Sequence, residues 1–126
     1  MKWTPALATG EEAIDAQHRE LFRCLADLQQ AATEGRTLYA VYTLTRLKHY
    51  VRDHFAVEEA LLRDCKYPKL AVHRKEHRVF QKSVDEFQVK CINADVTPEM
   101  VVFLTDWLTQ HIAGSDLDYV PYLKQT

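Results

Sequence analysis

The feature that most constrains this chain is a set of histidines and carboxylates at helix positions where leucine or valine is expected. Apolar residues recur in steps of three and four along four segments, which is the period of an amphipathic helix. Five of the six histidines fall on these apolar stripes together with one glutamate, and an aspartate follows the last of them. The seven residues are His18, His54, Glu58, His73, His77, His111 and Asp116. Burying such groups unpaired would be costly, so we expect a metal centre to compensate them.

The stripes predict a helical bundle. Four helices are expected, over about residues 14–34, 37–65, 69–91 and 98–114. An extended N-terminal arm, residues 1–13, precedes them, and a C-terminal tail, residues 115–126, follows. Gly35 is placed to stop the first helix, and Pro98 to start the last. We therefore expect an all-α fold, an antiparallel up-down-up-down four-helix bundle with an extended arm, in which residues 1–126 form one domain.

The second predicted helix shows most clearly how polar residues enter the stripe. Its stripe is made of Leu44, Leu47, Val51, His54, Glu58 and Leu61. His54 and Glu58 lie one helical turn apart, as do His73 and His77 in the third helix, so each pair shares a face. His49 lies off the stripe, and we expect it to be exposed and not a ligand.

Asp116 has the least regular place among the seven. It follows His111 by five residues, which corresponds to about 140° of rotation along an α-helix and would aim the two side chains in different directions. Gly114 lies between them, and a break in the helix there is one way to return Asp116 to the site; the spacing alone leaves this open.

Composition and charge argue against several classes of function. The chain has 16 basic and 18 acidic residues, which gives no electrostatic reason to bind nucleic acid or anionic lipid. No segment reaches the roughly 20 apolar residues of a membrane span, and no signal peptide is evident. Cys24, Cys65 and Cys91 are odd in number and form no C-x-x-C pair, which favours a reducing compartment. We expect a cytoplasmic monomer, and the roles of the cysteines stay open.

The number of ligand-type residues indicates two metals. Five imidazoles and two carboxylates exceed the four ligands of a tetrahedral zinc site. If both carboxylates and an oxide or hydroxide bridge two metals, three histidines complete six-coordination on one metal, while two histidines leave an open position on the other. Histidine and carboxylate ligands together are compatible with iron.

Several motifs make nearly the whole chain similar to the hemerythrin family. They are the arm with Trp3, IDAQH ending at His18, HFAVEE beginning at His54, YP followed by H-x-x-x-H, and WLTQHIAGSD ending at Asp116. In its single-domain form the chain resembles a bacteriohemerythrin. It departs from many bacterial members at Leu62, where they carry methionine.

The resemblance implies an oxygen-binding protein that is not an enzyme. It implies reversible dioxygen binding at a non-heme di-iron centre with an oxo or hydroxo bridge, for oxygen transport, storage or delivery to a recipient protein. By the same resemblance His73, His77 and His111 would hold the filled iron, and His18 and His54 the oxygen-binding iron. Glu58 and Asp116 would bridge the two irons.

Other residues and other functions remain open at this point. Phe55, Trp107, Leu108 and Ile112 are candidates for an apolar wall around the centre. Gln17, Asp15 and Tyr119 are candidates to hydrogen-bond the outer nitrogens of the ligand imidazoles, and Glu59 is either solvated or an outer partner. The alternative functions are oxygen, redox or nitric oxide sensing, and a di-iron peroxidase or oxidase activity.

Overall fold

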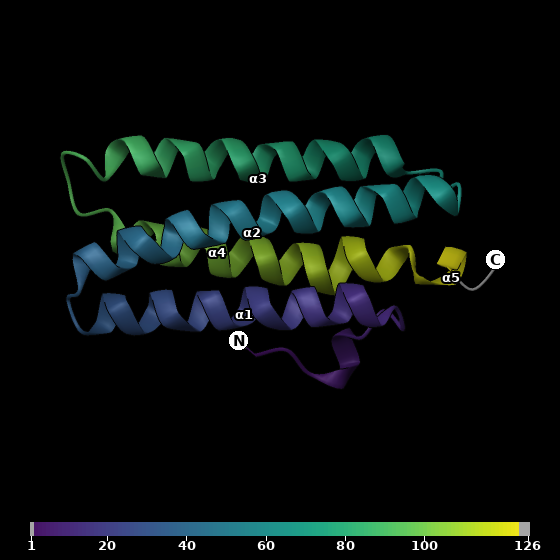
Figure 1. Cartoon of the computed structure of the whole chain (residues 1–126), viewed down its shortest axis with the longest axis horizontal. Helices are drawn as coiled ribbons and strands as arrows, with labels where there is room; N and C mark the ends of the chain where they lie inside the picture. Colours follow the sequence, from purple (N-terminus) through teal and green to yellow (C-terminus); the bar gives the residue numbers. More distant parts are fainter. Residues whose placement is uncertain (1, 124–126) are drawn as a thin grey trace.

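Four long helices lie side by side and alternate in direction (Figure 1). The computed structural model describes residues 2–123. The long helices are α1 Glu12–Thr33, α2 Thr37–Asp64, α3 Leu70–Lys90 and α4 Thr97–Gln110. The shorter elements are the 3-10 turn η1 Pro5–Leu7, the π-helix η2 His111–Asp116 and the helix α5 Val120–Leu123. The predicted all-α antiparallel four-helix bundle is therefore confirmed.

The apolar stripes of the four helices meet in the core of the bundle. Ile14, Leu25, Leu44, Phe80 and Leu104 are all fully buried. The burial of these aliphatic and aromatic side chains supplies the main driving force for the bundle.

One stripe assignment in α2 was wrong by one residue. Leu62 is fully buried while Leu61, which had been assigned to the stripe, is half-buried. Successive residues of a helix are separated by about 100°, so two neighbouring apolar residues at the edge of a stripe compete for the core.

The first helix stops where the sequence predicted. Gly35 has a φ of +67°, the left-handed conformation that glycine adopts without steric penalty. The Arg36 amide donates to the Ala31 carbonyl at 2.9 Å, and the Gly35 amide to that of Ala32 at 3.3 Å, which is the Schellman arrangement.

The N-terminal arm is tied to α1 and is not extended throughout. It includes the 3-10 turn η1, and α1 begins at Glu12, within the range expected for the arm. The Asp15 carboxylate accepts hydrogen bonds from the Thr9 amide and the Thr9 hydroxyl, both at 2.8 Å, and from the Gly10 amide at 3.3 Å. Asp15 therefore fastens the arm, and the expectation that it contacts a ligand imidazole was wrong.

The sequence had suggested a break in the helix at Gly114, but the helix continues through this residue. The chain forms a π-helix from His111 to Asp116, so Ser115 and Asp116 continue the helical path and do not belong to a free tail. A π-helical turn closes hydrogen bonds between residues five apart and thus takes in one residue more than an α-helical turn. Residues five apart, such as His111 and Asp116, consequently share a face. The tail beyond them also contains α5, and the predictions for residues 1 and 124–126 lie outside the described residues.

Replacing Gly114 with alanine is expected to preserve the fold. An added Cβ would meet no heavy atom within 4 Å, and the φ of Gly114 is not positive. Alanine also restricts the unfolded chain, so the free energy of unfolding should rise by about 0.5–1 kcal/mol. Urea denaturation measures this change. As the control, Gly35→Ala should destabilise the fold by roughly 1 kcal/mol, because the φ of Gly35 is positive. A loss of stability in Gly114→Ala would contradict the prediction.

Within residues 2–123, no helix combines the length and the apolar character that crossing a membrane requires.

Candidate metal centre

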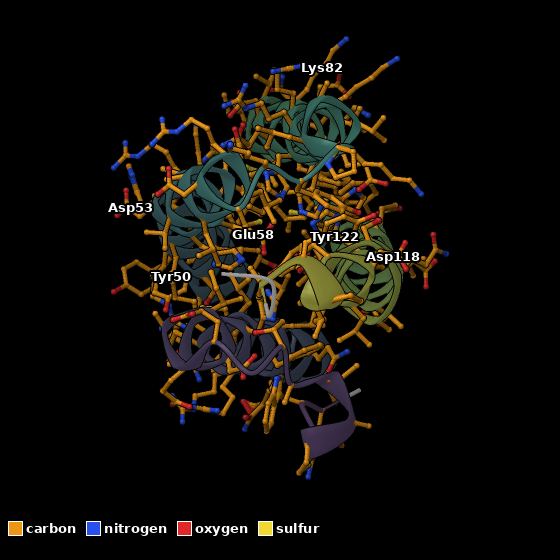
Figure 2. All side chains as sticks on the ribbon, turned by 90° about the vertical axis from the view of Figure 1, so that its right-hand side faces the viewer. Tyr50, Asp53, Glu58, Lys82, Asp118 and Tyr122 are labelled. Atoms are coloured by element: carbon orange, nitrogen blue, oxygen red, sulfur yellow. The ribbon has the colours of Figure 1, made fainter. Side chains whose placement is uncertain are left out.

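Seven ionisable side chains meet inside the bundle, near the end where α4 passes into η2. The α1 helix contributes His18, α2 contributes His54 and Glu58, α3 contributes His73 and His77, and η2 contributes His111 and Asp116. Figure 2 shows Glu58 in the middle of the bundle, whereas the labelled Asp53 and Lys82 lie at its outside. Each of the seven side chains is at most 5% exposed. The structure thus brings together all seven residues that the sequence singled out.

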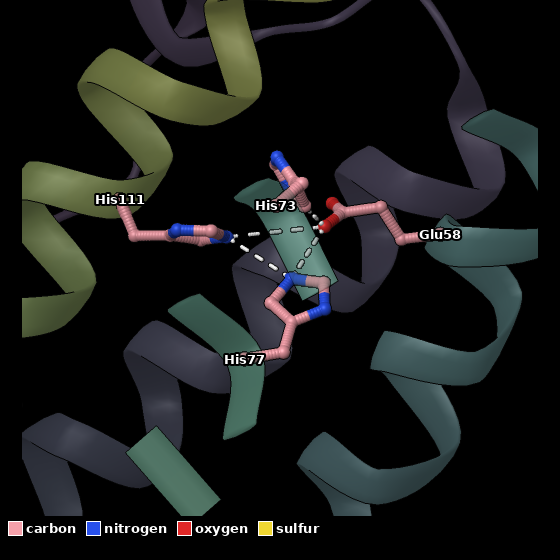
Figure 3. Close-up of side chains that lie close together, drawn as sticks. All are labelled: Glu58, His73, His77 and His111. Carbon is pink, nitrogen blue, oxygen red and sulfur yellow. Dashed lines mark hydrogen bonds and ion pairs between the residues drawn. The ribbon is translucent and has the colours of Figure 1, made fainter. Parts of the chain in front are cut away.

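The Glu58 carboxylate divides the histidines into two groups. Its Oε1 lies 2.7 Å from Nε2 of His73 and 2.9 Å from Nε2 of His77, and His111 completes this group (Figure 3). Its Oε2 lies 3.6 Å from Nε2 of His18 and 3.7 Å from Nε2 of His54. One oxygen therefore faces three histidines, and the other faces two.

The Asp116 carboxylate also lies between the two groups. Its Oδ1 lies 3.0 Å from Nε2 of both His73 and His111, and its Oδ2 lies 3.0 Å from Nε2 of His18. Two sets of ligand atoms result, each within 4.8 Å: Glu58, His73, His77 and His111, and His18, His54, Glu58 and Asp116.

The donor atoms have the arrangement that cations require. Both oxygens of Asp116 and both ring nitrogens of His18 are buried without a well-aligned hydrogen bond, although Oδ2 of Asp116 lies 3.0 Å from Nε2 of His18. The Nε2 atoms of His77 and His111 lie 3.1 Å apart, although the Nδ1 atom of each ring already lies beside a carboxylate. In neutral rings with Nδ1 protonated, two lone pairs would face each other across this gap. A cation between the two rings would satisfy both, so the residues present fit a metal.

Protons take part of the role of the metal charge when no metal is bound. Burial alone would lower the pKa of His18, His73 and His111. Close contacts with the carboxylates of Asp116 and Glu58, and the charge attraction from them, outweigh burial and raise the pKa to about 9 for His18, about 9 for His73 and about 11 for His111. Burial prevails at His54 and lowers its pKa to about 4. Although burial opposes the charged form of Glu58 and Asp116, the neighbouring histidines hold the pKa of both carboxyls below the usual range.

The outer nitrogens of three ligand rings have hydrogen-bond partners of different kinds. Nδ1 of His54 lies 2.7 Å from the Gln17 side-chain oxygen, as the sequence had suggested. The Tyr119 hydroxyl donates instead to Glu58 Oε2 at 3.0 Å, so the hydrogen bond expected from Tyr119 to an imidazole nitrogen was wrong. Glu59 contacts Nδ1 of His77 at 2.8 Å. Sequence reasoning missed Glu76, which contacts Nδ1 of His111 at 3.1 Å.

Aromatic rings cover the group of three histidines. Phe55 stacks on His77 with ring centroids 3.7 Å apart and an interplanar angle of 2°. Trp107 stacks on His111 at 4.3 Å and 18°. Leu108 and Ile112, the other candidates for an apolar wall, are buried in the same core. These side chains restrict the access of water to the centre.

The other histidine and the cysteines do not belong to either ligand set. His49 is exposed, as expected. All three cysteines are unpaired; Cys24 is buried beside Arg46, whereas Cys65 and Cys91 are half-buried. Burial raises the pKa of the Cys24 thiol, although the hydrogen bond from Arg46 opposes the shift.

Comparisons with known proteins agree with this fold and with a metal site. The family model described as the hemerythrin HHE cation binding domain matches residues 9–123. A bacteriohemerythrin from Stenotrophomonas maltophilia (strain R551-3) is 32% identical, over 97% of this chain and 80% of the relative. A myohemerythrin from Theromyzon tessulatum is 28% identical, over 94% of this chain and 89% of the relative. The crystal structure of a wild-type hemerythrin matches with a TM-score of 0.90 and 31% identity, over 98% of this chain and 97% of that one. This chain belongs to the hemerythrin family.

Proposed function

We propose that this protein binds dioxygen reversibly at a non-heme di-iron centre and serves oxygen transport, storage or delivery. The observation that carries the proposal is the uneven division at the Glu58 carboxylate, whose Oε1 faces the group of three histidines and whose Oε2 faces His18 and His54. A symmetric pair of sites would fill both metals equally. The uneven division supports one filled metal and one with an open position for a small ligand.

The proposed ligand roles follow this division. His73, His77 and His111 would hold the filled iron, and His18 and His54 the iron that takes up dioxygen. Glu58 and Asp116 would bridge the two irons, together with an oxide or hydroxide. The set of imidazoles and carboxylates suits iron, and bundles of this kind can carry di-iron centres between their helices.

The remaining residues hold this geometry and keep water out. When bound, the iron pair supplies the electrons that dioxygen accepts and returns. Gln17 orients His54 through the hydrogen bond at 2.7 Å, and the Tyr119 hydroxyl fixes the Oε2 atom of Glu58. Phe55 and Trp107 lie flat against ligand rings and limit their rotation. The residues around the centre orient the proposed ligands and cover them, and the proposed function gives none of them a proton-transfer step. We therefore propose a binding protein and not an enzyme.

The proposal also includes a cellular compartment, binding partners and an oligomeric state. Three unpaired cysteines favour a reducing compartment, such as the cytoplasm, as the place of action. The partners would be dioxygen and an oxygen-consuming recipient protein. The monomeric state stays a prediction.

Metal analysis combined with an aeration cycle tests the function. We expect about two irons per chain, as the ligand count requires. Absorption bands of an oxygenated centre should appear when the anaerobically reduced protein meets air, and should disappear when oxygen is removed. Irreversible oxidation alone would refute the carrier role. A single zinc per chain would refute the ligand assignment, and rapid turnover of peroxide or nitric oxide would favour the enzymatic or sensing alternatives.

A further inference from the structure

The outer hydrogen bonds of the ligand histidines carry different charges in the two groups. In the group of three, Nδ1 of His77 lies 2.8 Å from a carboxylate oxygen of Glu59, and Nδ1 of His111 lies 3.1 Å from a carboxylate oxygen of Glu76. In the group of two, the partner of His54 is the neutral amide of Gln17 at 2.7 Å. Nδ1 of the other ring in that group, His18, is buried without a hydrogen-bond partner. Carboxylates thus support one group, and none supports the other through an outer nitrogen.

Both outer carboxylates are themselves held in place. The second oxygen of Glu59 accepts a hydrogen bond from Nε of Arg74 at 3.2 Å, a contact that joins α2 to α3. The second oxygen of Glu76 accepts one from the Ser115 hydroxyl at 3.0 Å, which joins α3 to η2. Each carboxylate therefore has one oxygen on a ligand ring and one on an anchoring residue. This arrangement fixes the position of each carboxylate and, through it, the orientation of the ligand ring.

A carboxylate and an amide affect an imidazole differently. A carboxylate that accepts the Nδ1 proton fixes the tautomer with Nε2 free, and it raises the basicity of that nitrogen as a metal donor. Hydrogen bonds to an ionised acceptor are about twice as strong as those between neutral groups. An amide oxygen fixes the same tautomer but strengthens the donor less. Each of the two rings with a carboxylate partner should therefore be a stronger metal donor than the ring with an amide partner.

We propose that Glu59 and Glu76 are positioning residues that make the group of His73, His77 and His111 the tighter metal position, so that it fills before the position beside His18 and His54. This inference rests on the ligand sets of the proposed function. The inference adds the order in which the two metal positions fill. The cause of that order is a pair of residues, Glu59 and Glu76, that are not themselves metal ligands.

Zinc titration of the metal-free protein, in competition with a chromophoric chelator, tests the order directly. The wild-type protein should bind two zinc ions in two resolved steps. Glu59→Gln and Glu76→Gln should each weaken the first step by about 10–100-fold and leave the second step nearly unchanged. The change Glu59→Asp keeps the charge and should restore part of the loss. Glu86→Gln, an exposed glutamate of α3, is the matched control and should change neither step.

Two further readouts separate positioning from a general effect on the fold. In nitrogen NMR of the zinc-loaded wild-type protein, His77 and His111 should be protonated at Nδ1, with hydrogen-bonded proton shifts that Glu59→Gln and Glu76→Gln reduce. Gln17→Glu should strengthen the second step alone.

The results distinguish this inference from the function on which it rests. If the wild-type protein binds fewer than two metals, the ligand sets fail and the inference fails with them. If it binds two metals but the steps have equal affinity, or if the two variants weaken both steps alike, the inference alone is overturned.

Discussion

Glu58→Gln is expected to abolish reversible oxygen binding and to lower the iron content from about two per chain to one or none, because a bridging carboxylate is lost. In the wild-type protein the two oxygens of Glu58 face different histidine groups. Oε1 lies 2.7 Å from Nε2 of His73, and Oε2 lies 3.6 Å from Nε2 of His18. Glutamine keeps the shape of the side chain but removes the anion that two neighbouring cations require. It also points an amide N–H toward one of the two groups.

Iron analysis and the aeration cycle together measure this loss. Circular dichroism should show that the helices persist, since the apolar core of Ile14, Leu25 and Leu44 is untouched. The same change at the exposed Glu86 is the control and should retain both the iron and the absorption bands. A Glu58→Gln protein that still held two irons and cycled with oxygen would rule out a bridging role for Glu58.

Removal of the metals by a chelator is expected to lower the melting temperature by roughly 15 °C near neutral pH. Metal that binds only the folded chain stabilises it by about 4 kcal/mol when its concentration is a thousand times the dissociation constant. Without the metal, the buried carboxylates retain only the protons of the neighbouring histidines as counter-charges. Differential scanning calorimetry of the loaded and the chelated protein measures the difference.

The difference between the two forms should widen as the pH rises. In the metal-free protein the pKa of His18 and of His73 is raised to about 9, and that of His111 to about 11. A raised pKa in the folded state stabilises fully below the unfolded value of about 6.5, and this stabilisation is lost as the pH rises through the folded value. For each proton that the folded state binds in excess of the unfolded state, the free energy of unfolding falls by about 1.4 kcal/mol per unit of pH increase.

The metal-free melting temperature should therefore fall from pH 6.5 toward pH 9, while that of the loaded protein changes little. His54, with its pKa lowered to about 4, acts below this range. A metal-free protein that becomes more stable between pH 6.5 and pH 9 would contradict the charge arrangement described for the centre.

The main elements of the fold could be predicted because the four helices are long and regular. The stripe of α2 kept its period through His54 and Glu58, and burial of both followed from that period alone. Gly35 was recognisable as a stop because a single local conformation decides its role. Errors arose at the edges of stripes, where Leu61 and Leu62 compete for the core and packing with other helices decides.

The parts of the site that could not be predicted depend on contacts between elements. The Glu76 side chain is 39% exposed and does not share the helix face of His73 and His77, so its position in the sequence resembles that of a surface residue. Its contact with His111 depends on how closely η2 approaches α3. The role of Asp15 was mistaken for a similar reason, since the arm that it holds has no periodicity of its own.

The π-helical turn also has a consequence for engineering such a centre into another protein. A bundle designed only from regular α-helices would need its acidic residue four positions after the histidine, at 115, where this chain has serine. The longer turn here moves the acid to 116, and position 115 is then available for the hydroxyl that holds Glu76. Transferring the seven ligand residues onto regular α-helices would place the acid at position 115 and remove that hydroxyl. The π-helical turn must therefore be transferred together with the ligand residues.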